Sequence, residues 1–323
     1  MKPGILVIRL LALVLLCCLV ACAGLPPRHS ELQAPGYVTA ESSDSLLSRY
    51  APLFILEEAD KSYNRIGTPG IRAGEHGEVE TYVDPARPAL YAMQQSFHSG
   101  GRNYTNLVYR VHFEKIPYRH LTAGRNVGLI ILITLDENEN PLLLTSVHTC
   151  GCYLAFIPTS YLAEEAYPEN WSLVSQPVYG ERLPGQILIP EHKPYRFALQ
   201  IRSGTHRVKN LELLTEEDMD SSHLLKVDLK PMEALRQLSF GQQRVSFFET
   251  AGPRKGYVRG SQKPYERLLM SWWAFDWRVG EDKDFGPREE TGTTFYTSLK
   301  LWAREESDLW NFSRFLRYWG WRL

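Results

Sequence analysis

A short stretch in the middle of the chain, His148-Thr149-Cys150-Gly151-Cys152, carries residues that could do chemistry. Imidazole nitrogen and thiolate sulfur are ligands that zinc prefers, and soft thiolates also suit copper(I). The same two cysteines could instead form a disulfide, or lie buried as small free thiols beside a core histidine. The remaining cysteines all lie at position 22 or earlier, so the three interpretations concern one pair.

The spacing of these residues restricts each interpretation. Side chains two apart on a regular strand point the same way but lie about 6.6–6.8 Å apart, which would separate His148 and Cys152 by about 13 Å. A zinc ion holds thiolates at about 2.3 Å, and a disulfide needs Cβ atoms about 3.5–4.5 Å apart. Both chemistries therefore require a bend, and Gly151 permits one because glycine readily adopts positive φ.

A metal site here, for zinc or copper, would need a fourth ligand from elsewhere. His112 is the first choice, because it lies on the polar face of a nearby predicted strand. The further candidates are Glu114, His98 and His120. Arg110, His112 and Glu114 could also act with His148 as an acid–base set. A solvated strand face explains the same three residues without any chemistry.

Aromatic residues gather near the C-terminal end in two groups, one around Trp272 and Trp273 and the other around Trp310 and Trp319. Exposed rings would suit stacking against a sugar or peptide ligand, or contact with a membrane interface, where tryptophan is enriched. Their helical spacing favours another interpretation, in which the rings form the core between a terminal helix and a sheet. The four tryptophans are the candidates for ligand stacking.

The elements that would position these residues are mostly strands. Apolar residues alternate along 107–114, which predicts a half-buried strand, and 128–148 reads as a hairpin whose first arm is central in a sheet. Further alternation occurs over 197–201, 225–229 and 295–301. Helices are predicted from Pro231 to Leu238, from Pro264 to Asp276, and as a C-terminal amphipathic helix from Ser307 to Trp319. The sequence therefore predicts a β-rich α+β fold with mainly antiparallel sheets.

Composition limits the partners and the number of domains. The chain has 323 residues, 44% of them hydrophobic, and a formal net charge of −1. With no excess of basic residues and no sustained basic cluster, nucleic acid is not an expected partner. A globular body is predicted over 44–323, as one domain or as two subdomains, 44–165 and 166–323.

The N-terminal residues indicate where the protein goes. Lys2 and Arg9 lie before an unbroken apolar run from Leu10 to Val20, which small residues follow. This is the layout of a secretory signal. The next feature, Leu19-Val20-Ala21-Cys22, resembles the lipobox of bacterial lipoproteins. The resemblance implies cleavage of the signal peptide 1–21 and attachment of lipid such as palmitate to Cys22. It also implies an outer-membrane location facing the periplasm, because Ala23 follows the cysteine rather than the aspartate often found in lipoproteins retained at the inner membrane.

Residues 22–43, rich in proline, alanine and serine, would be a flexible tether between the membrane and the body. The expected role is binding or envelope assembly, with an envelope protein or a glycan as partner. The alternative is a periplasmic metal-dependent or thiol-redox enzyme centred on His112, His148, Cys150 and Cys152. An enzyme predicts that these four side chains converge in an open cleft. A binding protein predicts that they are buried and that a groove is lined by the aromatic residues instead.

Overall fold

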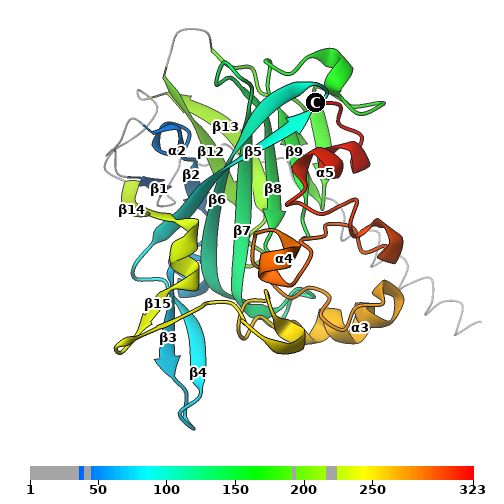
Figure 1. Cartoon of the computed structure of the whole chain (residues 1–323). Helices are drawn as coiled ribbons and strands as arrows, with labels where there is room; N and C mark the ends of the chain where they lie inside the picture. Colours follow the sequence, from blue (N-terminus) through cyan, green and yellow to red (C-terminus); the bar gives the residue numbers. More distant parts are fainter. Residues whose placement is uncertain (1–35, 40–44, 191–193, 216–223) are drawn as a thin grey trace, which may run out of the picture. The chain divides into compact units, whose positions relative to one another are not determined.

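The computed structural model describes residues 36–39, 45–190, 194–215 and 224–323. The predicted signal peptide, the lipobox with Cys22, and most of the predicted tether lie outside the described residues. From residue 34 onward the chain forms one compact unit. Figure 1 shows this body as a curled sheet with helices and long connections against one of its faces.

The main sheet has ten strands. In order across the sheet they are β13 (Val208–Thr215), β12 (Tyr195–Ile201), β2 (Leu53–Leu56), β1 (Gly36–Thr39), β14 (Leu224–Pro231), β5 (Ala89–Ser99), β6 (Arg102–Ile116), β7 (Gly124–Leu135), β8 (Pro141–His148) and β9 (Ala155–Pro158). Three neighbouring pairs are parallel, namely β1–β14, β2–β12 and β5–β14, and the other pairs are antiparallel. The predicted β-rich, mainly antiparallel α+β class is confirmed.

Smaller elements surround this sheet. The hairpins are β3 (Thr68–Ala73) with β4 (Val79–Asp84), β10 (Ser175–Val178) with β11 (Glu181–Pro184), and β15 (Leu238–Phe240) with β16 (Gln243–Val245). The α-helices are α2 (Leu46–Arg49), α3 (Pro264–Ala274), α4 (Arg288–Thr291) and α5 (Phe312–Tyr318). The 3₁₀ helices are η1 (Ser62–Asn64), η2 (Glu164–Ala166), η5 (Met232–Arg236), η6 (Gly252–Arg254) and η7 (Leu301–Ala303).

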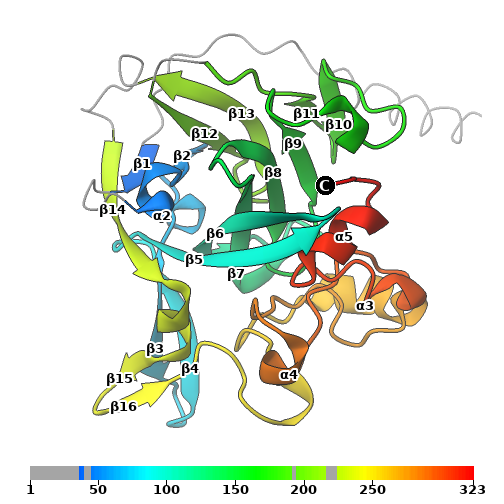
Figure 2. The same cartoon turned by 45° about the horizontal axis from the view of Figure 1, so that its top comes forward.

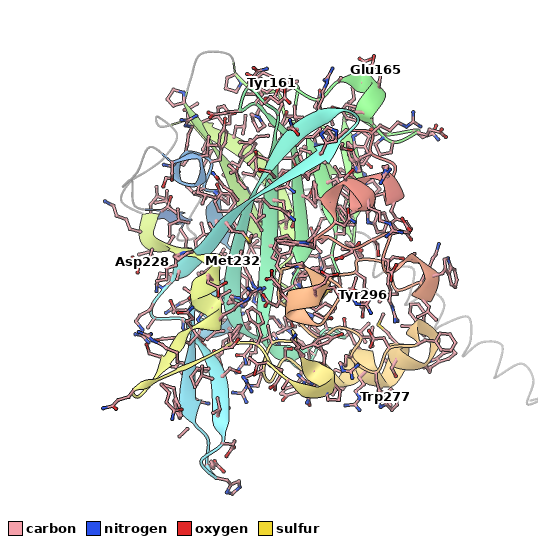
Figure 3. All side chains as sticks on the ribbon, viewed as in Figure 1. Tyr161, Glu165, Asp228, Met232, Trp277 and Tyr296 are labelled. Atoms are coloured by element: carbon pink, nitrogen blue, oxygen red, sulfur yellow. A yellow bond between two sulfur atoms is a disulfide. The ribbon has the colours of Figure 1, made fainter. Side chains whose placement is uncertain are left out.

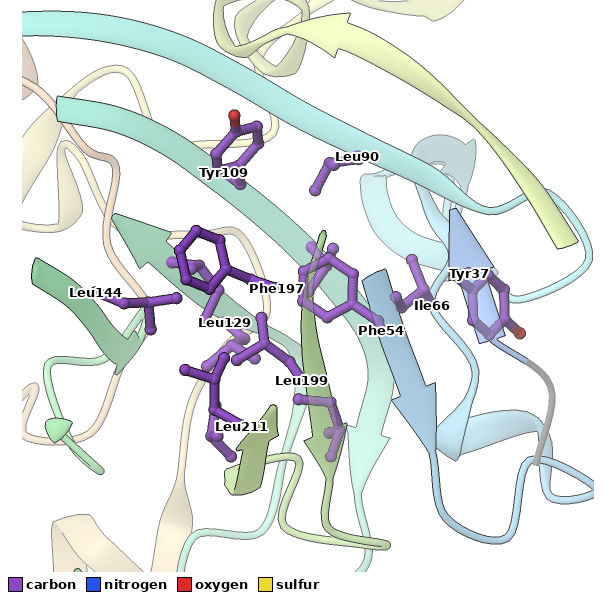
Figure 4. Close-up of a cluster of buried hydrophobic side chains, with 14 of the residues drawn as sticks. Tyr37, Phe54, Ile66, Leu90, Tyr109, Leu129, Leu144, Phe197, Leu199 and Leu211 are labelled. Atoms are coloured by element: carbon purple, nitrogen blue, oxygen red, sulfur yellow. The ribbon is translucent and has the colours of Figure 1, made fainter. Parts of the chain in front are cut away.

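The concave face of the sheet encloses the first hydrophobic core. Figures 1 and 2 show the strands curling around this space, and Figure 4 shows Phe54, Tyr109 and Phe197 among the side chains of this core. The predicted alternation along β6 is confirmed on this side, because Leu107, Tyr109 and other alternate residues are fully buried in this core. Strands on both sides of residue 165 line the same core, so that position does not separate two sheets.

The C-terminal part of the chain covers the opposite face of the sheet. Val108 of β6 and Ile130 of β7 pack there against Phe247, Phe285 and other apolar residues from 232–323. This cover corrects one sequence interpretation. Arg110 and His112 share that face of β6 and were expected to face solvent, but both side chains are completely buried.

Three local predictions need correction. The helix predicted at 231–238 is the short η5, and the one predicted at 307–319 is confined to α5. The strand predicted at 295–301 is wrong. Thr297 N–H donates to the Ser307 carbonyl and Leu309 N–H donates to the Phe295 carbonyl. These two bonds form a short backbone pairing, so 295–301 is not a full strand and 307–309 is not helical. The helix predicted from Pro264 is confirmed as α3.

Part of the predicted tether also belongs to the sheet. Residues 36–39 form β1, which lies between β2 and β14. Tyr37 fixes this strand because its ring is buried in the concave core. A short strand with an aromatic and two β-branched residues has the composition that fits a pleated surface.

Candidate functional site

The bend that a metal site or a disulfide would require is present at the end of β8. Residues 148–152, called the HTCGC turn below, reverse the chain so that His148 N–H donates to the Cys152 carbonyl at 2.9 Å. Gly151 has a φ of +93°, as the bend requires. The turn brings the two cysteines together, and a disulfide joins Cys150 and Cys152 with their Cα atoms 5.6 Å apart.

Together with His148, the two cysteines form a group that could hold a metal. The ligand atoms of the three residues lie within 4.8 Å of one another. The sulfur atoms are joined to each other, and a disulfide sulfur is a poor ligand compared with a thiolate, so metal binding here would require reduction. His148 itself is suited to coordination, because burial and the nearby Lys263 ammonium hold its pKa well below the ordinary value and keep the imidazole neutral.

The predicted companions of this group are placed elsewhere. His112 is buried on β6, where its Nε2 accepts a hydrogen bond from Arg110 Nε at 2.9 Å. Glu114 is partly exposed and accepts from Ser62 Oγ at 3.0 Å. His98 contacts the side chain of Asn103, and His120 lies near Gly204. In the described chain, the group of potential metal ligands comprises His148, Cys150 and Cys152 alone.

Three charged side chains are buried between the HTCGC turn and the C-terminal cover, namely those of Lys263, Asp282 and Lys283. Lys263 Nζ lies 3.5 Å from Asp282 Oδ2, with both side chains completely buried. The other Asp282 oxygen accepts from the Thr149 hydroxyl. Lys283 Nζ donates to the Cys150 carbonyl at 2.7 Å and lies 4.3 Å from the centre of the Tyr296 ring. These contacts hold the turn against the C-terminal cover.

Burial is the largest cause of the pKa shifts of the cations that lie between the sheet and its C-terminal cover. It lowers the pKa of Lys283 to about 8 and that of Arg110 to about 10, because a cation loses hydration when it leaves water. Arg110 compensates in part by donating from Nη1 to the Lys283 carbonyl at 3.0 Å. His112, His148 and Cys150 are buried, so no open cleft reaches them, whereas Cys152 at the end of the turn is partly exposed.

Because three histidines are buried, we expect the folded protein to lose stability in mild acid. Burial lowers the pKa values of His112 and His148 well below 6.5 and that of His206 to about 3. The unfolded chain therefore binds more protons than the folded one as pH falls from about 6.5 towards 3, and stability is lost across that window. Three such groups contribute a slope of up to about 4 kcal/mol per pH unit. Urea unfolding between about pH 7.5 and pH 5 measures this slope. His206→Gln should reduce it by about a third, and an unchanged slope would contradict this account.

A cavity on another side of the body has a volume of about 1140 Å³. We call it the α3 pocket. Its walls come from the β3–β4 hairpin, the end of β6, the start of β7 and helix α3 (Figure 1). The lining residues are Arg72, Tyr82, Val83, Glu114, Lys115, Ile116, Tyr118, Gly124, Arg125, Asn126, Gly260, Gln262, Pro264, Arg267, Leu268, Ser271, Trp272 and Trp277.

Helix α3 has its apolar side turned outward. Glu266, Ser271 and Ala274 are the buried residues of the helix. Leu268 is 75% exposed and Trp272 is 72% exposed. Trp277, just beyond the helix, is also exposed, and Figure 3 shows it at the α3 edge of the body. The interpretation that this group of rings forms core is wrong.

The second aromatic group does form core. Trp310 is half-buried and packs edge-on against Phe285, with ring centres 5.1 Å apart. Trp319 is also half-buried, and its Nε1 donates to Thr297 Oγ1 at 3.1 Å. Of the four tryptophans suggested for ligand stacking, Trp272 lines the α3 pocket and Trp273 is exposed nearby on the same helix.

Sequence reasoning missed the cationic wall of the α3 pocket. Arg72 on β3 and Arg125 at the start of β7 both pair with Glu80 on β4, at 2.8 and 2.6 Å. Arg72 and Glu80 are directly opposite each other in the β3–β4 hairpin, and opposite charges on the two sides of a turn were a signal of that pairing. The sequence held no indication that this hairpin stands opposite α3, because that contact depends on how distant segments pack.

No described helix is long and apolar enough to cross a membrane. The chain matched no protein-family model, and comparisons with curated proteins and with solved structures also found no match. The described fold and the geometry of its sites are therefore the basis for a functional assignment.

Proposed function

We propose that this protein is a lipid-anchored binding protein of the bacterial cell envelope, facing the periplasm, whose ligand occupies the α3 pocket. The single observation that carries the binding role is the pocket itself, which is large and lined by tryptophan and tyrosine side chains. The lipobox-like residues ending at Cys22 support the anchor. The burial of His112, His148 and Cys150 argues against the alternative of an enzyme centred on them.

The anchor is tested by labelling cells with a radioactive fatty acid. The wild-type protein should take up the label and fractionate with the outer membrane, and Cys22→Ser should lose both properties, because a stable anchor requires the attached acyl chains. Label that persists in the Cys22→Ser variant would refute lipidation at this residue.

The pocket is tested in intact cells with a photoreactive phenylalanine analogue placed at one position of the full chain. An analogue replacing Trp272 should form a defined adduct on illumination, because this side chain lines the pocket. An analogue replacing Trp302 is the matched control, since Trp302 is 81% exposed and does not line the pocket. Equal adducts at both positions would contradict a specific site at α3.

We also propose that the His148–Cys150–Cys152 group binds zinc or copper once an external reductant, such as a phosphine, has supplied two electrons that convert its disulfide to two thiols. Two thiolates and a neutral imidazole form a soft donor set that suits either ion. The oxidised full chain should bind neither metal at this site, and the reduced chain should bind about one equivalent. Cys152→Ser should abolish that binding. Metal that remains bound to the Cys152→Ser variant would place the site elsewhere.

A further inference from the structure

The outward apolar face of α3 needs an explanation, because it is exposed while the polar Glu266 is buried beneath it. Leu268, Leu269, Trp272 and Trp273 follow one another at helical spacing and are all exposed. A contiguous exposed patch of large apolar side chains marks a site that contacts another molecule. The patch continues into the α3 pocket through Leu268 and Trp272, so the contact and the cavity belong to one site.

The α3 pocket carries excess positive charge, contributed by both of its walls. Arg72 and Arg125 share a single carboxylate, that of Glu80, whose pKa these two guanidinium groups lower to about 2. One of the two positive charges is therefore not neutralised by that pair. Arg267, on α3, lies over the Trp277 ring at 5.0 Å, and no described carboxylate forms an ion pair with it. Lys115 is compensated by Glu114 at 3.2 Å.

The two walls differ in the chemistry that they offer. One presents guanidinium groups with free donors, which recognise phosphate and carboxylate oxygens. The other, formed by α3, presents leucine and tryptophan side chains beside Arg267, and burial of these side chains against apolar surface is favourable. The cavity of about 1140 Å³ is also larger than the roughly 300–1,000 Å³ typical of small-molecule sites. A ligand that satisfies both walls has an anionic head and a hydrocarbon part.

We propose that the α3 pocket binds a single amphiphile with an anionic headgroup. The headgroup contacts Arg72, Arg125 and Arg267, and the hydrocarbon lies along Leu268 and Trp272. This inference rests on the proposed function, because it names the chemical class of the ligand for the same pocket. It also accounts for the exposed face of α3, which the hydrocarbon covers.

The test uses the full chain held in nanodiscs of phosphatidylcholine and titrated by calorimetry with dioctanoyl phosphatidic acid. The wild type should bind this probe. Dioctanoyl phosphatidylcholine and inorganic phosphate should each bind at least about tenfold more weakly, since the choline group neutralises the phosphate of the first and the second has no hydrocarbon part. Equal binding of either comparison probe would overturn the proposal, as would no binding of phosphatidic acid.

Matched variants locate the binding. Arg125→Ala, Arg267→Ala and Trp272→Ala should each weaken binding of phosphatidic acid by about tenfold or more. Arg288→Ala and Trp302→Ala are the controls, because both side chains are exposed and lie outside the pocket. They should change the affinity by less than about twofold. A loss of affinity in the controls as large as in the pocket variants would overturn the proposal.

A bilayer is the other source of the same chemistry. Vesicles of phosphatidylcholine with and without phosphatidylglycerol separate the two cases. Binding to the anionic vesicles without binding of the short-chain probe would replace the single-molecule site by membrane docking. A protein or glycan adduct at position 272 in cells, with no binding of the probe, would refute this inference and leave the proposed function standing.

Discussion

Replacing Gly151 by alanine should lower the free energy of unfolding by about 2–5 kcal/mol. Two causes act together at this position. The φ of +93° is unfavourable for any residue with a Cβ atom. An added Cβ would also lie 2.1 Å from the Tyr296 carbonyl oxygen, so the turn and the C-terminal cover would have to move apart.

Gly180→Ala separates the two causes. Gly180 has a similar φ of +83°, but an added Cβ there would meet no atom within 4 Å. This control should lose only the backbone part, about 1–2 kcal/mol. Urea unfolding of both variants measures the difference. Equal losses would show that the close approach of Tyr296 does not constrain the HTCGC turn.

Lys263→Met should destabilise the protein by about 3–5 kcal/mol, because it leaves the Asp282 carboxylate buried without its counterion. The methionine side chain fills much of the space of the lysine, so loss of packing contributes little. Both side chains of the pair are completely buried in the wild type. Water therefore does not take the place of the lysine ammonium beside the Asp282 carboxylate.

The double variant Lys263→Met with Asp282→Asn identifies the origin of this loss. Asparagine keeps an oxygen that can accept from the Thr149 hydroxyl but removes the negative charge. The double variant should therefore be more stable than Lys263→Met alone. Lys300→Met, at an exposed position, should change the stability by less than about 0.5 kcal/mol. A double variant less stable than the single one would refute the explanation by an unpaired charge.

The sequence predicted best where one short segment determines its own environment. The apolar alternation along β6 and the continuous apolar run of β7 each reflect residues that face a core, and the polar residues 136–140 mark the turn between β7 and β8. The sequence also showed that a metal site or a disulfide would each require a bend that Gly151 permits, because the distance between Cys150 and Cys152 is a local property. It left metal site, disulfide and free thiols open, and the structure contains the disulfide.

Predictions failed where a distant segment supplies the environment. Arg110 and His112 resemble a solvated strand face until residues 247–285 cover them, and nothing within 107–114 encodes that cover. The apolar stripe of α3 resembles a core-facing helix, yet Glu266 is buried on the inner side, close to the buried residues Lys263, Asp282 and Lys283. The α3 pocket combines three segments that are far apart in the sequence, so its cationic wall could not be predicted from any one of them.

The position of β1 has a consequence for how the chain acquires its structure. Gly36 pairs with Leu224, and β2 pairs with β12, so the first two strands find these partners only after most of the chain is available. Contacts between such distant residues slow folding to milliseconds or seconds, because a long loop must close before they form. During synthesis, which proceeds from the N-terminus, β1 and β2 stay without these partners until β12 and β14 have been made. A folding assay should therefore find that a chain ending before residue 224 does not reach the native state, and its exposed strand edges would make it a substrate for chaperones and proteases.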